Sequence, residues 1–348
     1  MTSGPQIINR ILILGNGFDL AVGRRTTYKD FYDSEYCPKD YPAPLIKYLN
    51  EKKWENGLEN VRWLDLETAL QEYAMKPSKD DYYSKEEISA LSTHFRYPDK
   101  YKYLDGFSTL AERDEKIQHE RIIANLTREN RLPSEESIFD EAKKERMTRE
   151  QIALSEIEQG LSAYLLNEEK TKYCGQGKNA VDLLKRYLKD DYSSIYSFNY
   201  THIGDLLEPS NVLERIAYDA KIHYMHGSLN CGHVIIGAKD GDYGDYDFIQ
   251  KSFDEEYKSS TLLADMQEAN EVDIYGHSLG DCDSQYFKLF FNGLVSEQQE
   301  NNKNKKRITI YTYDKNSEIQ IKKNLNKLTD YRLSWLYSKC NVEIKKAK

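Results

Sequence analysis

Short runs of aliphatic residues, separated by longer polar stretches, dominate the hydrophobic pattern of this chain. The first run is Ile11–Leu14, and four consecutive aliphatic residues are typical of a parallel strand that is buried on both faces. Similar runs follow in the second half of the chain, at Ser194–Phe198, Ile222–Met225, Val234–Ile236, Val272–Tyr275 and Ile308–Tyr311. We interpret all of these runs as strands of a sheet.

Helical periodicity follows the later runs. Apolar residues recur three or four positions apart, first at Tyr286, Phe290 and Leu294, and again at Ile321, Leu325 and Leu328. Strands that alternate with helices are expected of a parallel sheet with crossover helices. The pattern therefore predicts an α/β fold of the Rossmann type.

The stretch 31–189 has a different texture, because it is charged, rich in tyrosine and helical in its spacing. Apolar residues recur at helical intervals at Leu154, Ile157, Leu161 and Leu165. Thr148 and Gln151 form a capping-box pattern just before them, which predicts a helix start at Thr148. We expect a large helical insertion after the first strand and its glycine turn, with residues 1–30 and 190–348 forming the sheet domain.

Composition narrows the function classes. The formal net charge of −9 argues against a general nucleic-acid binder, which needs a surplus of lysine and arginine. The five cysteines are dispersed and form no C-x-x-C pair, which indicates a reducing compartment. Residues 1–10 lack the apolar stretch of a signal peptide, and no segment is long and apolar enough to span a bilayer. We expect a cytoplasmic protein without a membrane partner.

A glycine-rich segment, which predicts a turn, follows the first aliphatic run. The segment Gly15-Asn16-Gly17-Phe18-Asp19 follows the run directly, and Gly23 closes it. Glycine has no Cβ, so its backbone can approach a phosphate, and the start of a following helix favours an anion. The third glycine lies further away than in G-x-G-x-x-G, so a turn that serves packing alone is the alternative.

Polar clusters also end three later runs. They are Asn199, then His226-Gly227-Ser228, and then Gly276-x-Ser278-Leu279. Ligands of open parallel sheets bind at the carboxyl ends of the strands, so we expect these clusters to share one crevice with the glycine turn. The alternatives are an Asx turn for Asn199, backbone contacts for His226 and a helix cap for Ser278. We expect no metal, because strand alternation turns His223 away from His226.

The order of these clusters resembles the nicotinamide-dinucleotide domain of the sirtuins. The residues that carry this resemblance are Gly15, Gly17, Gly23, Asp30-Phe31, Asn199, His226-Gly227-Ser228 and Gly276-x-Ser278-Leu279. The chain resembles the bacteriophage abortive-infection AbiH family more closely, from about Ile11 to Asp314. The boxes that carry this second resemblance are Gly15–Leu20, Trp63-x-Asp65-Leu66-Glu67 and Ser197–Thr201. Only Cys231 lies where sirtuin deacetylases carry paired zinc cysteines, so lysine deacetylation is not expected.

The resemblance implies that the chain binds NAD or a related adenine nucleotide and hydrolyses the bond between nicotinamide and ribose. Asn199 suits the fixing of ribose hydroxyls and water, and His226 suits the handling of a proton. Asp19 is expected on a ribose hydroxyl or as a helix cap. The full set of expected nucleotide-binding positions is Gly15, Asn16, Gly17, Phe18, Asp19, Gly23, Asp30, Phe31, Gly227, Ser228, Gly276, Ser278 and Leu279.

These observations predict a cytoplasmic antiviral protein that acts as an NAD glycohydrolase when infection is sensed, releasing nicotinamide and ADP-ribose. The alternatives are a nucleotide-binding sensor without turnover, a nuclease-type toxic effector and, on weaker grounds, a dehydrogenase. In the box around Trp63 the acids are expected to begin a helix, with Glu67 reaching the nucleotide site as the second interpretation. The tyrosine-rich insertion is interpreted as a packing or homo-oligomer surface, or as a sensor of a phage component.

Overall fold

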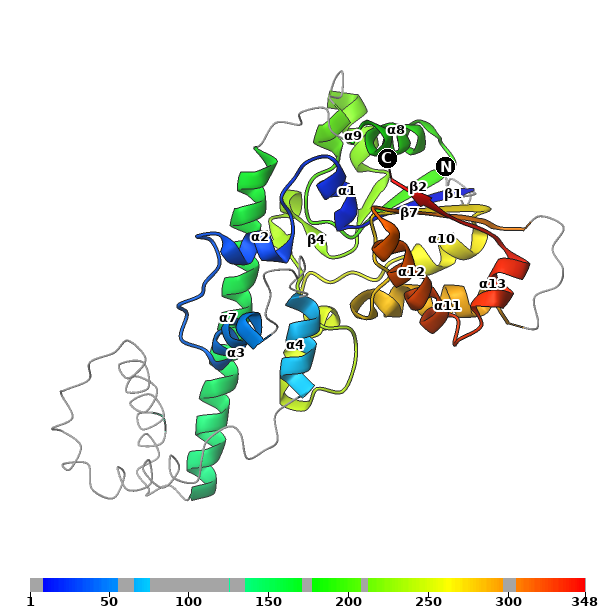
Figure 1. Cartoon of the computed structure of the whole chain (residues 1–348). Helices are drawn as coiled ribbons and strands as arrows, with labels where there is room; N and C mark the ends of the chain where they lie inside the picture. Colours follow the sequence, from blue (N-terminus) through cyan, green and yellow to red (C-terminus); the bar gives the residue numbers. More distant parts are fainter. Residues whose placement is uncertain are drawn as a thin grey trace, which may run out of the picture.

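A computed structural model describes residues 9–55, 66–75, 125, 135–170, 177–207, 212–296 and 305–347. Its centre is a six-stranded parallel sheet with the strand order β3-β2-β1-β6-β7-β8 (Figure 1). The strands are β1 (Arg10–Leu14), β2 (Ser193–Ser197), β3 (Ile222–Tyr224), β6 (Glu271–Tyr275), β7 (Arg307–Thr312) and β8 (Asn341–Lys346). The predicted α/β fold of the Rossmann type is confirmed.

Two details of the predicted sheet are wrong. Val234–Ile236 supplies no strand of the main sheet; β5 (His233–Val234) pairs antiparallel with β4 (Gly227–Ser228) in a separate two-stranded sheet. The sequence pattern also missed β8, in which half-buried Val342 and Ile344 alternate with exposed polar residues. An edge strand with one solvated face lacks the continuous aliphatic run that marks a central strand.

The helices divide between the two faces of the sheet according to the direction of their crossovers (Figure 1). On one face, α8 and α9 share a core with Leu12 and Leu14 of β1. On the other, the helices that precede β6 and follow it share a core with Ile11 and Ile13. The bounds are α8 (Lys178–Lys189), α9 (Val212–Asp219), α10 (Leu262–Glu268), α11 (Ser284–Leu294), α12 (Lys315–Leu328) and α13 (Leu333–Lys339). The connections reverse direction between β1 and β6, which is where ligands of such sheets bind.

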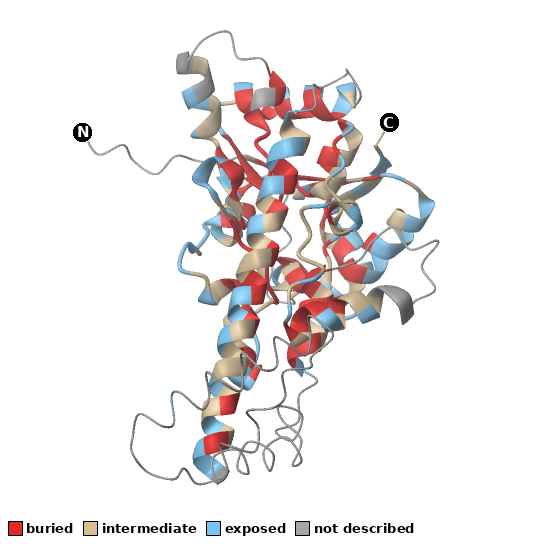
Figure 2. Cartoon of the chain, turned by 90° about the vertical axis from the view of Figure 1, so that its left-hand side faces the viewer, coloured by how far each residue is buried: buried red, intermediate tan, exposed pale blue. Residues whose placement is uncertain are grey.

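A long helical segment leaves the sheet after β1. Its helices are α1 (Asn16–Ala21), α2 (Tyr28–Asp33), α3 (Pro44–Glu55), α4 (Leu66–Met75) and α7 (Glu135–Glu169). The 35-residue α7 forms a rod along this side of the molecule, with buried and exposed side chains interleaved along its length (Figure 2). α8 lies within the stretch predicted as insertion, yet it packs on β1 and β2.

The predicted helix start at Thr148 is wrong, because α7 begins at Glu135. The hydroxyl of Thr148 donates to the carbonyl of Lys144 at 3.0 Å, one turn back in the same helix. Threonine makes such a bond inside helices as well as capping bonds at their ends. No helix among the described residues is long and apolar enough to cross a membrane.

A third core joins the insertion to the segment after β3. Leu154, Ile157 and Leu161 of α7 pack in one cluster with Leu229 and Tyr246. This segment contains the 3-10 helices η4 (Leu229–Cys231), η5 (Gly244–Ile249) and η6 (Lys251–Phe253); η3 (Gly204–Leu207) and η7 (Asp281–Asp283) lie in the loops that follow β2 and β6. The shared core holds the insertion over the carboxyl edge of the sheet.

Candidate functional site

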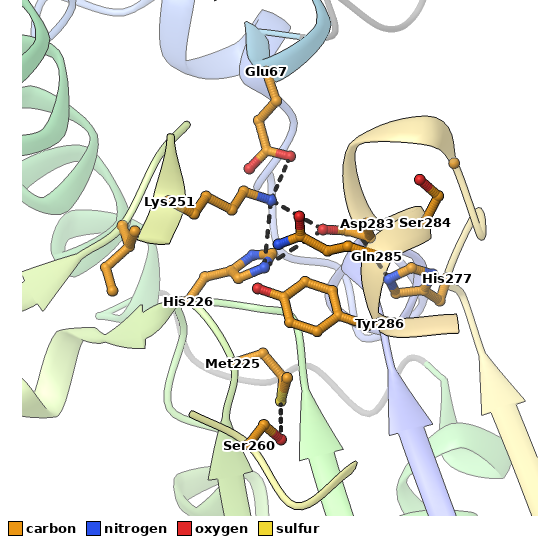
Figure 3. Close-up of polar contacts among 12 residues, drawn as sticks. Glu67, Met225, His226, Lys251, Ser260, His277, Asp283, Ser284, Gln285 and Tyr286 are labelled. Carbon is orange, nitrogen blue, oxygen red and sulfur yellow. Dashed lines mark hydrogen bonds and ion pairs between the residues drawn. The ribbon is translucent and has the colours of Figure 1, made fainter. Parts of the chain in front are cut away.

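A buried lysine stands at the centre of a charged cluster at the carboxyl edge of the sheet (Figure 3). The ammonium of Lys251 donates to Glu67 Oε2 at 2.9 Å and to Asp283 Oδ1 at 2.9 Å. It lies 3.3 Å from Nε2 of His226. Lys251 is 0% exposed, so bulk water does not solvate its charge and the ammonium depends on partners within the protein. Three ammonium hydrogens thus meet three acceptors.

Each member of this cluster comes from a different part of the chain. Glu67 lies in the first turn of α4, in the insertion. His226 follows β3, and Lys251 begins η6. Asp283 stands at the N-cap of α11, but its side chain makes no capping bond. Its carboxylate instead faces Lys251, because a fully buried ammonium is costly without charged partners.

His277 extends the cluster on the β6 side. Its Nδ1 accepts the backbone N–H of Leu279 at 2.9 Å, so in the neutral ring the proton is assigned to Nε2. That Nε2 lies 3.3 Å from Asp283 Oδ2. Asp283 therefore receives Lys251 on one carboxylate oxygen and His277 on the other.

Burial and charge fix the protonation states of the cluster. Burial, assisted by the charge of Lys251, lowers the pKa of His226 to about 3, so the imidazole is neutral at pH 7. Burial alone would raise the pKa of Asp283, but Lys251 and the two histidines hold it well below its usual value. Burial would likewise lower the pKa of Lys251, and Asp283 and Glu67 hold it well above its usual value. Since Nε2 of His226 faces the ammonium, its proton is assigned to Nδ1.

Aromatic rings enclose His226. The ring centroids of Phe198, Tyr200 and Tyr286 lie 5.2, 6.4 and 5.7 Å from that of the imidazole. Burial raises the pKa of the Tyr200 and Tyr286 hydroxyls, so both stay protonated donors at pH 7. The hydroxyl of Tyr28, from the insertion, lies 3.3 Å from that of Tyr200.

Asn199 lies in the chain between Phe198 and Tyr200, the two ring neighbours of His226 after β2. It is 5% exposed, and within the described part of the chain neither its amide oxygen nor its amide nitrogen has a hydrogen-bond partner. Its amide oxygen therefore forms no Asx turn. A buried amide without partners is costly, and such groups are often reserved for a ligand.

The glycine turn packs against the loop after β6. A Cβ added to Gly15 would lie 2.5 Å from the Cα of His277, and one added to Gly17 would lie 2.6 Å from the Cα of Gly276. The N–H of Gly17 also donates to the carbonyl of Gly276 at 2.9 Å. In this structure the missing Cβ atoms admit protein backbone, and Gly276 itself has φ +66°.

The other predicted positions around α1 have protein partners. Asp19 is 1% exposed and binds Arg24 at 3.2 Å and the hydroxyl of Thr201 at 2.6 Å. The amide oxygen of Asn16 accepts the hydroxyl of Thr26 at 2.5 Å. The ring of Phe18 packs in the sheet core, and Gly23, with φ +89°, follows the end of α1.

The remaining predicted positions lie in three places. Asp30 and Phe31 belong to the insertion, where Asp30 accepts the Thr27 hydroxyl and Phe31 packs in the insertion core. Gly227, with φ +73°, and buried Ser228 follow His226 directly. Ser278 is exposed, whereas Leu279 packs in the core of the α10–α13 face.

The structure thus brings His226 and the loop after β6 together, and it adds Glu67, Lys251 and Asp283, which were not among the predicted site residues. A role for Glu67 at the nucleotide site was the second interpretation of the box around Trp63. Trp63 and Asp65 of that box lie outside the described residues. Asp283 directly precedes α11, a position at which an aspartate commonly caps a helix, so its place in the sequence does not mark it as a site residue. Lys251 carries no local signal, because its partners lie far from it in the chain.

The fold and the site define the class: a Rossmann-like α/β protein whose helical insertion completes a buried charged cluster at the carboxyl edge of the sheet. Comparison with family models then gives the family. The model described as "Bacteriophage abortive infection AbiH" matches residues 11–301, and the chain belongs to this family of phage-defence proteins. Searches of curated proteins and of solved structures gave no significant match. The resemblance to the sirtuins stays a prediction.

Proposed function

We propose that this abortive-infection protein binds NAD or a related adenine nucleotide and hydrolyses its N-glycosidic bond at the cluster around His226. One observation carries the proposal. At the carboxyl edge of a Rossmann-like sheet, a neutral imidazole lies beside a buried lysine that pairs with two carboxylates. The buried Asn199 amide, which has no hydrogen-bond partner among the described residues, belongs to the loop whose Phe198 and Tyr200 rings flank this imidazole.

The chemistry of the bond suits this set of side chains. The nicotinamide of NAD leaves as a neutral ring, so its departure needs no acid, and positive charge develops on the ribose. The carboxylates of Asp283 and Glu67 would stabilise that charge, and the free amide of Asn199 would hold a ribose hydroxyl or the attacking water. Water adds to the ribose carbon, and His226 accepts the proton that the water loses.

The neighbouring charge links ligand binding to the strength of this base. Beside Lys251, His226 is a weak base, with a pKa of about 3. A phosphate that draws the ammonium of Lys251 away would remove one of the causes that lower this pKa. We infer that the nucleotide itself would bring His226 closer to a useful pKa.

The test is release of nicotinamide from NAD by the purified protein, with and without extract of phage-infected cells. We expect His226→Ala and Asn199→Ala to lose roughly a hundredfold or more in rate. His223→Ala is the matched control, because His223 is exposed and its ring stacks on Tyr196 outside the cluster. Equal release by the control and the two site variants, or no release by wild type in either condition, contradicts the proposal.

A sensor without turnover is the second candidate, and the saturation of Lys251 favours it. All three ammonium hydrogens have acceptors, and His226 is a weak base in this state. Such a protein would show a lasting rise in melting temperature with NAD, since an unconsumed ligand continues to stabilise the folded state. A hydrolase would lose that rise as nicotinamide accumulates.

A further inference from the structure

A hollow lies at the carboxyl edge of the sheet, lined by residues of α1, of the start of α8 and of the ends of β6 and β7. Figure 1 shows where these elements lie. It has a volume of about 450 Å³ and lies between the ends of β6 and β7, the side of α1 and the start of α8. Gly17, Lys178, Tyr275, Tyr311 and Tyr313 are among its lining residues. No side chain of the Lys251 cluster lines it. The volume falls within the range of small-molecule pockets.

Backbone packing builds one wall of this hollow. Gly177, the N-cap of α8, has φ +67°, and a Cβ there would lie 2.5 Å from the carbonyl oxygen of Ala21 at the end of α1. The start of α8 is therefore seated against α1. The hollow is a fixed feature of the fold, because both helices also belong to the core of this face.

The start of α8 favours an anion. Gly177 supplies no side-chain cap, the first turn contains no acidic residue, and the helix begins with Lys178. The first backbone N–H groups of a helix have no acceptor within it, and they carry the positive end of its dipole. Among the described residues the lining includes this lysine and no carboxylate, although the whole chain has a net charge of −9. An anionic group such as a phosphate suits this end of the hollow.

Three tyrosines at the ends of β6 and β7 also line the hollow. Tyr275 and Tyr311 are stacked, with ring centroids 5.5 Å apart and planes inclined by 28°. Tyr313, two residues beyond Tyr311, is 73% exposed. An exposed ring beside a stacked pair offers a face on which a planar heterocycle can stack.

We propose that this hollow binds a mononucleotide, with its base against the tyrosines and its phosphate at the start of α8. The site is separate from the His226 cluster and does not depend on the proposed hydrolysis. Two sources share this chemistry: a free mononucleotide, and the adenosine phosphate half of a dinucleotide.

The probe is AMP, titrated into the full chain by calorimetry, with adenosine and inorganic phosphate as partial ligands. We expect saturable AMP binding that exceeds the binding of either partial ligand. Tyr313→Ala should weaken it about fivefold or more, the loss of one stacked base. Lys178→Glu should weaken it at least comparably, because it places an acid beside the phosphate. The matched controls are Tyr331→Ala, which removes a ring that is 77% exposed elsewhere, and Lys185→Glu, an exposed site further along α8.

Absence of saturable AMP binding up to about 5 mM, a very weak affinity, overturns the proposal. So does AMP binding that the two site variants leave unchanged. If NAD competes with AMP, and Tyr313→Ala raises the KM for NAD, the dinucleotide supplies the ligand; without competition a free mononucleotide does. Failure of nicotinamide release affects only the proposed function, because AMP binding is measured independently of it.

Discussion

Replacing Lys251 by methionine tests whether the charged cluster exists as described. The change keeps most of the aliphatic volume and removes the ammonium that lies 2.9 Å from Glu67 and 2.9 Å from Asp283. Both carboxylates are then left in a site where the lysine was 0% exposed. Removing one partner of a buried ion pair typically costs about 3–5 kcal/mol, because the remaining charge is uncompensated.

We therefore expect Lys251→Met to lower the free energy of unfolding at pH 7 by about 3–5 kcal/mol, a large share of the stability of a typical domain. Urea denaturation followed by circular dichroism measures this change. The matched control is Lys29→Met, which breaks the exposed Lys29–Asp33 pair and should leave the free energy of unfolding almost unchanged, because water screens that pair.

Two further measurements separate charge from packing. The triple variant Lys251→Met, Glu67→Gln, Asp283→Asn leaves no unpaired charge in the cluster, so it should recover most of the lost stability. In Lys251→Met the pKa of His226 should rise from about 3, because the neighbouring positive charge is gone, and NMR titration of the imidazole reports it. A loss of under about 1 kcal/mol for the single variant, or no recovery in the triple variant, would refute the assignment of a buried ion cluster.

Three other predictions follow from the same structure. As the pH falls from 6.5 toward 3, the unfolded state takes up a proton that native His226 does not, so the free energy of unfolding should drop by up to about 1.4 kcal/mol per pH unit. Burial raises the pKa of Glu158 from 4.5 to about 7, so between these pH values native Glu158 keeps a proton that the unfolded state releases. Glu158 therefore makes the free energy of unfolding fall as the pH rises, which opposes the effect of His226. Glu158→Gln removes this opposing effect, so the free energy of unfolding should rise more steeply with pH in this range. Both slopes can be measured by urea denaturation across that pH range, and parallel curves for the two proteins would count against the second. Gly17→Ala should destabilise the fold by about 1–3 kcal/mol, because its Cβ would lie 2.6 Å from the Cα of Gly276. Gly293→Ala, with nothing within 4 Å of its Cβ, should not destabilise the fold, and urea denaturation of the two variants measures the difference.

The central sheet could be predicted because most of its strands have a recognisable hydrophobic pattern in the local sequence. Ile11–Leu14 is a continuous apolar run that is buried on both faces, and Val272–Tyr275 is buried as well, with Asp273 as its single polar residue. Since the strands are parallel, their carboxyl ends meet at one edge, and His226 was therefore placed correctly at the edge that His277 shares. The edge strand β8 was missed because one of its faces is in solvent and its pattern is weak.

The charged cluster could be predicted only in part. Asp283 precedes a helix, and a sequence pattern cannot distinguish a cap from a carboxylate that a distant lysine needs. Lys251 is one lysine among many, and its burial depends on contacts with α4 and η7, which are far away in the chain. The glycines raise the same difficulty. The missing Cβ of Gly17 admits a phosphate or another backbone equally well, and here the backbone of Gly276 occupies that space.

The position of Glu67 has a consequence for how this protein can be divided. Glu67, one of the two carboxylates that pair with Lys251, lies within the insertion. Removing residues 31–189 would therefore not yield a smaller sheet domain with an intact charged cluster. It would leave an ammonium with a single carboxylate and expose the face that α7 covers. The helical segment and the sheet domain therefore share one ion pair, and a replacement for either part would have to supply the matching charge.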